Sequence, residues 1–135
     1  MADFPSNLRS MTVKDAVYPK AGHLLNYDTT TGAGTLTLTG AGETCFFVAL
    51  DESSRGDENV LDAAGATITA CPVGGMMYCR INASEVLVAG QLLYVGANGE
   101  ATKTAGSNKV LGHYMGSALT SVAGVLYAVN TKQTN

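Results

Sequence analysis

The feature that most constrains the fold is the dipeptide Asn98-Gly99, which stands between two short runs of strand-forming residues. Leu92 to Val95 is an apolar run, and a run of alternating polar character extends from Glu100 to Lys103. Asn-Gly accepts positive φ at both central positions of a tight turn, and this backbone matches the right-handed twist of paired strands. We therefore predict a β-hairpin at this point of the chain.

Strict alternation of polar and apolar residues marks another strand, from Thr35 to Thr39, bracketed on both sides by Gly-Ala-Gly. Such alternation is typical of a half-buried antiparallel strand. No segment of about 12 residues keeps a helical period with caps at both ends. The fold class that follows is all-β, a small β-barrel or β-sandwich with no helix longer than about three turns. The other predicted strands cover residues 12–18, 44–50, 66–70, 75–82, 91–96, 100–104, 110–115 and 124–130.

Glycine makes up 16 of the 135 residues, above the usual share of about 7%, and it gathers at predicted strand ends as short hairpins require. The positions expected to form structural turns are Gly90, Asn98, Gly99, Gly112 and Gly124. The strand side chains expected to face inward and form the core are Leu36, Leu38, Phe46, Val48, Ile68, Met77, Leu93, Val95, Val110, Leu126 and Ala128.

A chain of 135 residues has room for one domain with one core. Residues 1–10 show no pairing pattern, so we predict that they form a flexible N-terminal arm, followed by a single β domain over residues 11–135. Ala21–Tyr27 resembles Ala89–Val95 in sequence. This echo leaves a second arrangement open, with two small related lobes at about 11–70 and 71–135.

Only 14% of the residues are charged, against a usual share of about 25%, so much of the surface must be weakly polar, which suits an interface. The net charge is −3 and lysine and arginine form no cluster, so no nucleic-acid partner is expected. No apolar run approaches the roughly 20 residues that span a bilayer, and residues 1–7 carry no secretory signal. We therefore expect synthesis in a cytoplasm, no membrane, and reduced, buried cysteines at Cys45, Cys71 and Cys79.

No pattern in the sequence indicates catalysis or a metal centre. His23 and His113 are 90 residues apart, and no Gly-x-Ser-x-Gly turn is present to hold a nucleophile. Five carboxylates gather in one short segment, but their spacing differs from the Asp-x-Asp-x-Asp-Gly loop of calcium sites, so a solvated loop is expected. These are Asp51, Glu52, Asp57, Glu58 and Asp62. We predict that the protein is not an enzyme and holds neither a metal nor a cofactor.

A succession of structural glycines and apolar strands runs through the C-terminal half. It comprises Ala89-Gly90-Gln91-Leu92-Leu93-Tyr94-Val95, Asn98-Gly99, Val110-Leu111-Gly112 and Gly124-Val125-Leu126-Tyr127-Ala128-Val129. This succession resembles the capsid cement, or decoration, proteins of tailed bacteriophages over roughly residues 75–130, and residues 11–50 resemble them in general character. The resemblance implies a small β-rich protein that binds the outside of an icosahedral head, commonly as a trimer at three-fold or quasi-three-fold positions.

From this resemblance the expected partner is the major capsid protein, the expected assembly is a homotrimer, and the expected location is the capsid exterior of a virion, after synthesis in the host cytoplasm. The N-terminal arm is expected to make the contact by adding a strand to a neighbouring sheet edge, because main-chain hydrogen bonds then supply the affinity. The expected contact residues are Asp3, Phe4, Pro5, Ser6, Asn7, Leu8 and Arg9.

Two other classes of function stay open. An adhesion or small-ligand-binding β module on a virion surface would use the loop that contains Arg55-Gly56-Asp57. An enzyme would need His23, His113 and the carboxylates to be brought together by folding, and nothing in their spacing requires this.

Overall fold

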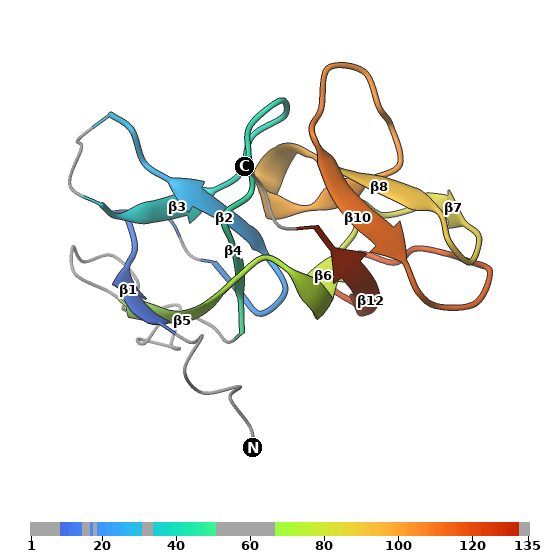
Figure 1. Ribbon diagram of the computed structural model, residues 1–135, viewed down its shortest axis with the longest axis horizontal. Coiled ribbons are helices and arrows are strands. Elements are labelled where there is room, and N and C mark those ends of the chain that lie inside the picture. The colour runs from blue at the N-terminus through green and yellow to red at the C-terminus, as the bar shows by residue number, and fades with distance from the viewer. Residues whose placement is uncertain (1–8, 15–16, 18, 31–33, 51–66, 133–135) are drawn as a thin grey trace.

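The computed structural model describes residues 9–14, 17, 19–30, 34–50 and 67–132, which form two five-stranded antiparallel sheets and one two-stranded sheet (Figure 1). Within these residues the helical structure consists of a single 3-10 turn, η3 (Ala97–Gly99). The all-β fold class predicted from the sequence is confirmed. The sheets are open and sandwich-like rather than closed into barrels.

The first sheet is formed by the N-terminal half, with the strand order β1-β5-β4-β2-β3. Its strands are β1 (Arg9–Thr12), β2 (Leu24–Tyr27), β3 (Leu36–Leu38), β4 (Phe47–Ala49) and β5 (Thr67–Pro72). The second sheet is formed by the C-terminal half, with the order β6-β12-β10-β8-β9. Its strands are β6 (Gly75–Arg80), β8 (Leu92–Val95), β9 (Ala101–Thr102), β10 (Val110–Tyr114) and β12 (Leu126–Thr131). The small sheet pairs β7 (Val86–Leu87) with β11 (Leu119–Thr120).

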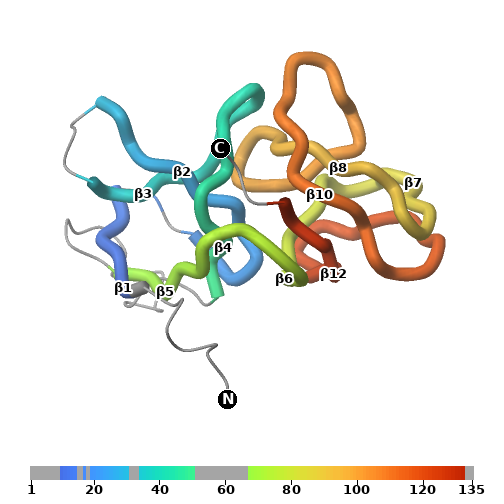
Figure 2. Tube along the Cα trace, in the orientation of Figure 1, coloured from blue at the N-terminus to red at the C-terminus, as the bar shows by residue number. Residues whose placement is uncertain are grey.

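The two large sheets repeat one topology. When β7 and β11 are set aside, the first strand of each half is the edge strand, the fifth lies beside it, and the fourth, second and third follow. Each half also has an isolated parallel bridge at the same point, Val13 to Leu36 in the first and Ile81 to Ala101 in the second. Figure 2 shows the two halves side by side along the chain trace. The repeated sequence segments noted above contain β2 and β8, which occupy equivalent places in the two sheets.

The core is made of two clusters of buried side chains. The larger one joins the two sheets, because Leu24 and Val48 of the first sheet pack with residues of the second. Its second-sheet members include Met77, Cys79, Leu93, Val95, Leu111, Tyr114, Tyr127 and Val129. The smaller cluster lies within the first half and comprises Val13, Leu25, Leu36, Phe47, Ala49, Ile68 and Ala70. The shared cluster fixes the two sheets against each other through burial of apolar area.

Most of the side chains that were expected to face inward are buried, but the prediction is wrong for three of them. Phe46, Val110 and Leu126 are each about 40% exposed, at 40%, 38% and 41%. Those that are buried as predicted are Leu36, Val48, Ile68, Met77, Leu93 and Val95, while Leu38 and Ala128 are partly buried. At the three wrong positions the next residue along the chain faces inward instead: Phe47, Leu111 and Tyr127. Side chains alternate with a period of two, so a one-residue error in register places them on the opposite face.

Local packing explains each of the three errors. The Phe46 ring packs on Tyr27 outside the core, with ring centroids 5.4 Å apart. Val110 precedes a bulge in β10, where the register against β8 shifts between Val110 and Gly112. A bulge adds one residue to a strand, so the side chains on its two sides no longer follow the inward and outward alternation that the sequence predicts. Leu126 covers the Gly22 turn, which leaves no space for a side chain there.

The strand boundaries also differ from the predictions in the N-terminal half. The strand predicted at residues 12–18 lies earlier, because β1 covers Arg9–Thr12 and pairs with β5, opposite Ala70 to Thr67. The sequence did not predict β2, β7 or β11 as strands. β2 has few residues and both of its leucines are buried, so it lacks the alternation that identified the other strands.

Candidate functional site

The predicted hairpin forms and its turn packs against the first sheet. Asn98 and Gly99 have φ values of 60° and 71°, and β8 pairs with β9 on either side of them. A Cβ atom on Gly99 would lie 2.9 Å from a Leu38 methyl group and 3.1 Å from the Leu24 carbonyl oxygen. Gly99 N also donates a hydrogen bond to Thr39 O at 3.0 Å. The turn is therefore a connection between the two sheets and is not available as a binding loop.

The other predicted turn positions hold the backbone in different ways. Gly90 and Gly124 have positive φ values of 81° and 79°, which a residue without a Cβ adopts readily. Gly112 lies within β10, where a Cβ would overlap Asn130 O of β12. Gly112 is thus required by close approach of two strands rather than by a turn.

The two histidines occupy different environments in different halves of the chain. His23 precedes β2 and is half-buried, and its Nδ1 accepts a hydrogen bond from Lys20 N at 2.8 Å. The pKa of His23 is lowered to about 4, mainly by burial of the ring and in addition by the positive charges of Arg80 and Lys20. His113 is exposed on β10, opposite Leu92. The described part of the chain thus gives His23 the environment of a neutral structural histidine.

The cysteines are free thiols. Cys45 and Cys79 are buried as predicted, and Cys71 is half-buried. Burial raises the pKa of Cys45 to about 12, and it raises the pKa of Cys79 as well. Burial also raises the pKa of Cys71. A nucleophilic cysteine needs a lowered pKa, so these thiols are in environments that disfavour the reactive thiolate.

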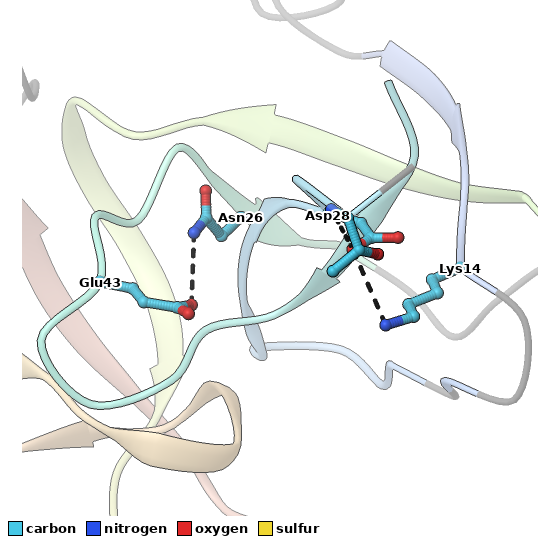
Figure 3. A network of polar contacts seen from close by, with 5 residues as sticks. Lys14, Asn26, Asp28 and Glu43 are labelled. Atoms are coloured by element: carbon cyan, nitrogen blue, oxygen red, sulfur yellow. Dashed lines mark hydrogen bonds and ion pairs between the residues drawn. The ribbon is translucent and has the colours of Figure 1, made fainter. Parts of the chain in front are cut away.

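A buried carboxylate lies at the edge of the first sheet (Figure 3). Asp28 Oδ1 accepts hydrogen bonds from Thr30 Oγ1 at 2.7 Å and Thr30 N at 3.2 Å, and Lys14 Nζ lies 3.7 Å away. The hydrogen bond from the Thr30 side chain is the main reason that the pKa of Asp28 lies below its usual value. Nearby, Asn26 Nδ2 donates to Glu43 Oε1 at 3.3 Å. These contacts join loops of the sheet to one another, which is a structural role.

Among the described residues, no group of three or more His, Cys, Asp or Glu side chains is placed to hold a metal ion. The five clustered carboxylates and Arg55-Gly56-Asp57 lie outside the described residues. Of the predicted contact residues, Asp3 to Leu8 also lie outside them, whereas Arg9 is the first residue of β1 and pairs with Ala70. In the described ranges, no helix is long and apolar enough to cross a membrane.

An apolar pocket of about 390 Å³ lies where the two sheets meet. Its lining comes from β6 and β12 of the second sheet and from the turns and strand ends of the first. The lining residues are Ala21, Gly22, Ala49, Leu50, Cys71, Gly74, Met76, Met77, Tyr78 and Leu126. The sequence reasoning missed this site, because its parts come from four separate chain segments. The available signal was the pair Met76 and Tyr78, two large side chains on the outward positions of a predicted strand.

No protein-family model matches the chain, and no curated protein matches it in sequence. A solved structure with the same fold is that of the N base of head fiber gp8.5 in bacteriophage phi29. The superposition has a TM-score of 0.66 and covers 95% of this chain and 98% of that chain, at 16% sequence identity. At this identity the likeness establishes the fold, and it extends over nearly the whole of both chains.

Proposed function

We propose that this protein is a structural component of a phage virion, a capsid cement or decoration protein that binds the outer surface of an icosahedral head and stabilises it. The observation that carries the proposal is the fold shared with the base of the phi29 head fiber, over 95% of this chain. The resemblance of residues 75–130 to capsid cement proteins points to the same class of function from the sequence. The low charge content suits a protein whose surface is covered in an assembly.

The proposed partner is the major capsid protein, and the proposed assembly is a homotrimer on the capsid exterior. A standard protein interface buries about 800 Å² per partner, so one small chain has a modest footprint. Three linked copies bind more durably, because the second and third contacts form at high effective concentration. Binding that favours the mature lattice stabilises that lattice by mass action.

The N-terminal arm is the proposed contact with the shell. β1 is an edge strand of the first sheet, and its first residue, Arg9, pairs with Ala70. The residues proposed to contact the capsid, Asp3 to Arg9, are therefore continuous in sequence with an edge strand. A strand added to the edge of a neighbouring sheet would gain main-chain hydrogen bonds and would need little side-chain specificity.

The test is to mix the purified protein with expanded phage heads that lack it and then to pellet the heads. We expect the protein to sediment with the heads at a saturating, stoichiometric ratio and to remain in the supernatant without them. Bovine serum albumin in the same mixture serves as the control for trapping. Absence of saturable binding to expanded heads from the protein's own phage would contradict the proposal.

A second candidate function is an adhesion or small-ligand-binding module on a virion surface, favoured by the apolar pocket of about 390 Å³. Ligand pockets are commonly of this size and are lined mainly by apolar side chains. An apolar fluorescent probe that is bound by the wild type and is not bound by Met77→Gln would favour this candidate, provided that head binding is absent.

A further inference from the structure

The two sheets repeat one topology, so each serves as an internal comparison for the other. The register places their residues in correspondence: Tyr78 lies opposite Ala128 between β6 and β12, as Ser10 lies opposite Thr69 between β1 and β5. The first sheet therefore carries two small polar side chains where the second carries a tyrosine and an alanine. The same fold is built with either chemistry on this face.

The correspondence continues along the same strands. Leu126 lies opposite Arg80 in the second sheet, and Thr67 lies opposite Thr12 in the first. The outward position of the fifth strand is thus a leucine in one half and a threonine in the other. The first half folds with a threonine there, so the topology itself does not require a leucine at this position, and Leu126 uses only part of its surface to cover the Gly22 turn. The apolar character of this face calls for another explanation.

The outward side chains of the second sheet are both large and exposed. Tyr78 is 62% exposed and Met76 is 56% exposed, and both stand on the edge strand β6. The outward positions continue across the sheet from Tyr78 to Ala128, its partner on β12. They then reach Met115, whose N donates a hydrogen bond to Ala128 O at 2.9 Å. Contiguous exposed apolar side chains on a soluble protein mark a surface that another molecule covers. We call this surface, formed by Met76, Tyr78, Met115, Leu126 and Ala128, the apolar face.

The apolar face is continuous with the pocket between the sheets. Met76, Tyr78 and Leu126 belong to the apolar face and also line the pocket. Leu50 lines the pocket from the first sheet and is itself 40% exposed. A partner that covers the face therefore has a recess of about 390 Å³ to fill with its own side chains.

The distribution of charge points to another copy of the chain as the occupant. The chain has a net charge of −3, so two copies repel each other unless they meet through an uncharged surface. The acidic side chains that the structure describes lie in loops outside the apolar face: Asp28, Glu43, Glu85 and Glu100. Arg80 borders the face, and its Nε donates a hydrogen bond to Ala21 O at 2.7 Å. Contact through this face brings apolar surfaces together and keeps the described acidic groups apart.

We propose that the apolar face is the surface through which copies of this chain associate with one another. Exposed residues around it, His113 and Asn130 on β10 and β12, supply a polar rim of the kind found at protein interfaces. In a ring, the apolar face of one copy covers the pocket of the next, a heterologous contact that closes by rotation. The inference rests on the trimer of the proposed function and is independent of the capsid as target.

The test replaces two side chains of the face by those that the first sheet carries at the matching positions, in the double variant Tyr78→Ser and Leu126→Thr. Because Ser10 and Thr67 occupy these positions in the same fold, the variant is expected to fold. The control is Val86→Thr, which shortens an exposed apolar side chain on β7, away from β6 in Figure 1. Sedimentation equilibrium gives the mass of each protein, and far-UV circular dichroism reports the fold.

We expect the wild type and Val86→Thr to sediment at three times the 13.9 kDa of the chain, and the double variant to sediment at 13.9 kDa with a β-sheet spectrum. A double variant that keeps the wild-type mass, or a wild type that is monomeric at every concentration, would overturn the inference. A monomeric wild type whose head binding is lost in the double variant would overturn it in favour of the capsid as occupant. A trimer that fails to bind heads would contradict the proposed function and leave this inference intact.

Discussion

At the scale of single residues, glycine positions that look alike in the sequence are required for different physical reasons. Gly90 has a φ of 81° and open space around a hypothetical Cβ, so its requirement is conformational. Gly112 has no positive φ, but a Cβ there would overlap Asn130 O, so its requirement is steric. A pattern of glycines in the sequence predicts turns. Only the tertiary contacts distinguish a glycine required for its backbone conformation from one required by the close approach of another strand.

The glycine contrast leads to a prediction on stability. Gly112→Ala should lower the free energy of unfolding by about 3 kcal/mol or more, because the strands β10 and β12 must separate to admit the methyl group. Gly90→Ala should cost about 1–2 kcal/mol, since only the left-handed backbone is strained. Urea denaturation of both variants measures the difference. Equal losses would contradict the steric reason given for Gly112.

The environment of His23 predicts that stability depends on pH. The pKa of His23 is lowered from 6.5 to about 4 in the folded protein, so the unfolded chain binds the proton more readily. The free energy of unfolding should therefore fall as the pH falls from 6.5 toward 4, and it should level off below that. Allowing for the partial exposure of the ring, we expect a contribution of about 1–2 kcal/mol.

His23→Asn tests this prediction, because the amide oxygen can still accept the hydrogen bond from Lys20 N. The variant should lose less stability than the wild type between pH 6.5 and 4. Burial raises the pKa of Glu100, and a raised carboxyl pKa changes stability with pH in the opposite direction, so the comparison is made between the two proteins. His113→Asn, on an exposed position, is the control. Parallel pH profiles for wild type and His23→Asn would refute the assignment.

At the scale of elements, β1 separates the part of the predicted arm that belongs to the fold from the part that precedes it. Residues 1–10 were predicted as an arm, yet Arg9 and Ser10 pair with Ala70 and Thr69 of β5. Residues 1–8 lie outside the described residues, so their predicted flexibility and capsid contact stay predictions. An arm deletion must therefore stop before Arg9 to leave the first sheet complete.

Removal of residues 2–8 should weaken binding to heads by about tenfold or more and should leave the thermal midpoint nearly unchanged. The physical reason is that the deleted residues would supply main-chain hydrogen bonds to the capsid, whereas the described pairing of β1 with β5 begins at Arg9. Pelleting at several protein concentrations measures the affinity. A variant with scrambled residues 2–8 tests whether side chains matter, since strand addition through the backbone should tolerate it. Unchanged binding after the deletion would remove the arm from the contact.

At the scale of the whole molecule, the two sheets share the larger of the two core clusters, and this argues that they unfold together. The larger cluster combines Leu24 and Val48 from the first sheet with Leu93 and Val129 from the second. The hairpin turn at Gly99 adds a hydrogen bond between the halves. The alternative of two separate lobes at about 11–70 and 71–135 stays a prediction, which domain-wise unfolding in calorimetry would support.

The proposed stabilising role makes a prediction on the assembled virion. DNA-filled heads that carry the protein should release DNA at a higher temperature than heads that lack it, because a ligand bound only to the mature shell stabilises that shell by mass action. Release can be followed by the fluorescence of an intercalating dye during heating. Adding the purified protein back to the deficient heads should restore the higher temperature. Equal release temperatures with and without bound protein would contradict a cementing role.

The sequence by itself determined the all-β class and the positions of several strands, because these depend on local chemistry. The alternation in residues 35–39 predicted the strand that the structure shows as β3, and Asn98-Gly99 predicted the turn between β8 and β9. Positive φ at Asn-Gly and the period of two act over a few residues and need no distant partner.

The tertiary structure decided what depends on distant pairing. The bulge at Val110 and the burial of Phe47 in place of Phe46 follow from which strands lie alongside, and a shift of one residue reverses the face. The repetition of one topology, the pocket between the sheets and the apolar face on β6 and β12 arise only when segments distant in the sequence meet. Long-range register is set by the fit of whole sheets against a shared core, which no local pattern encodes.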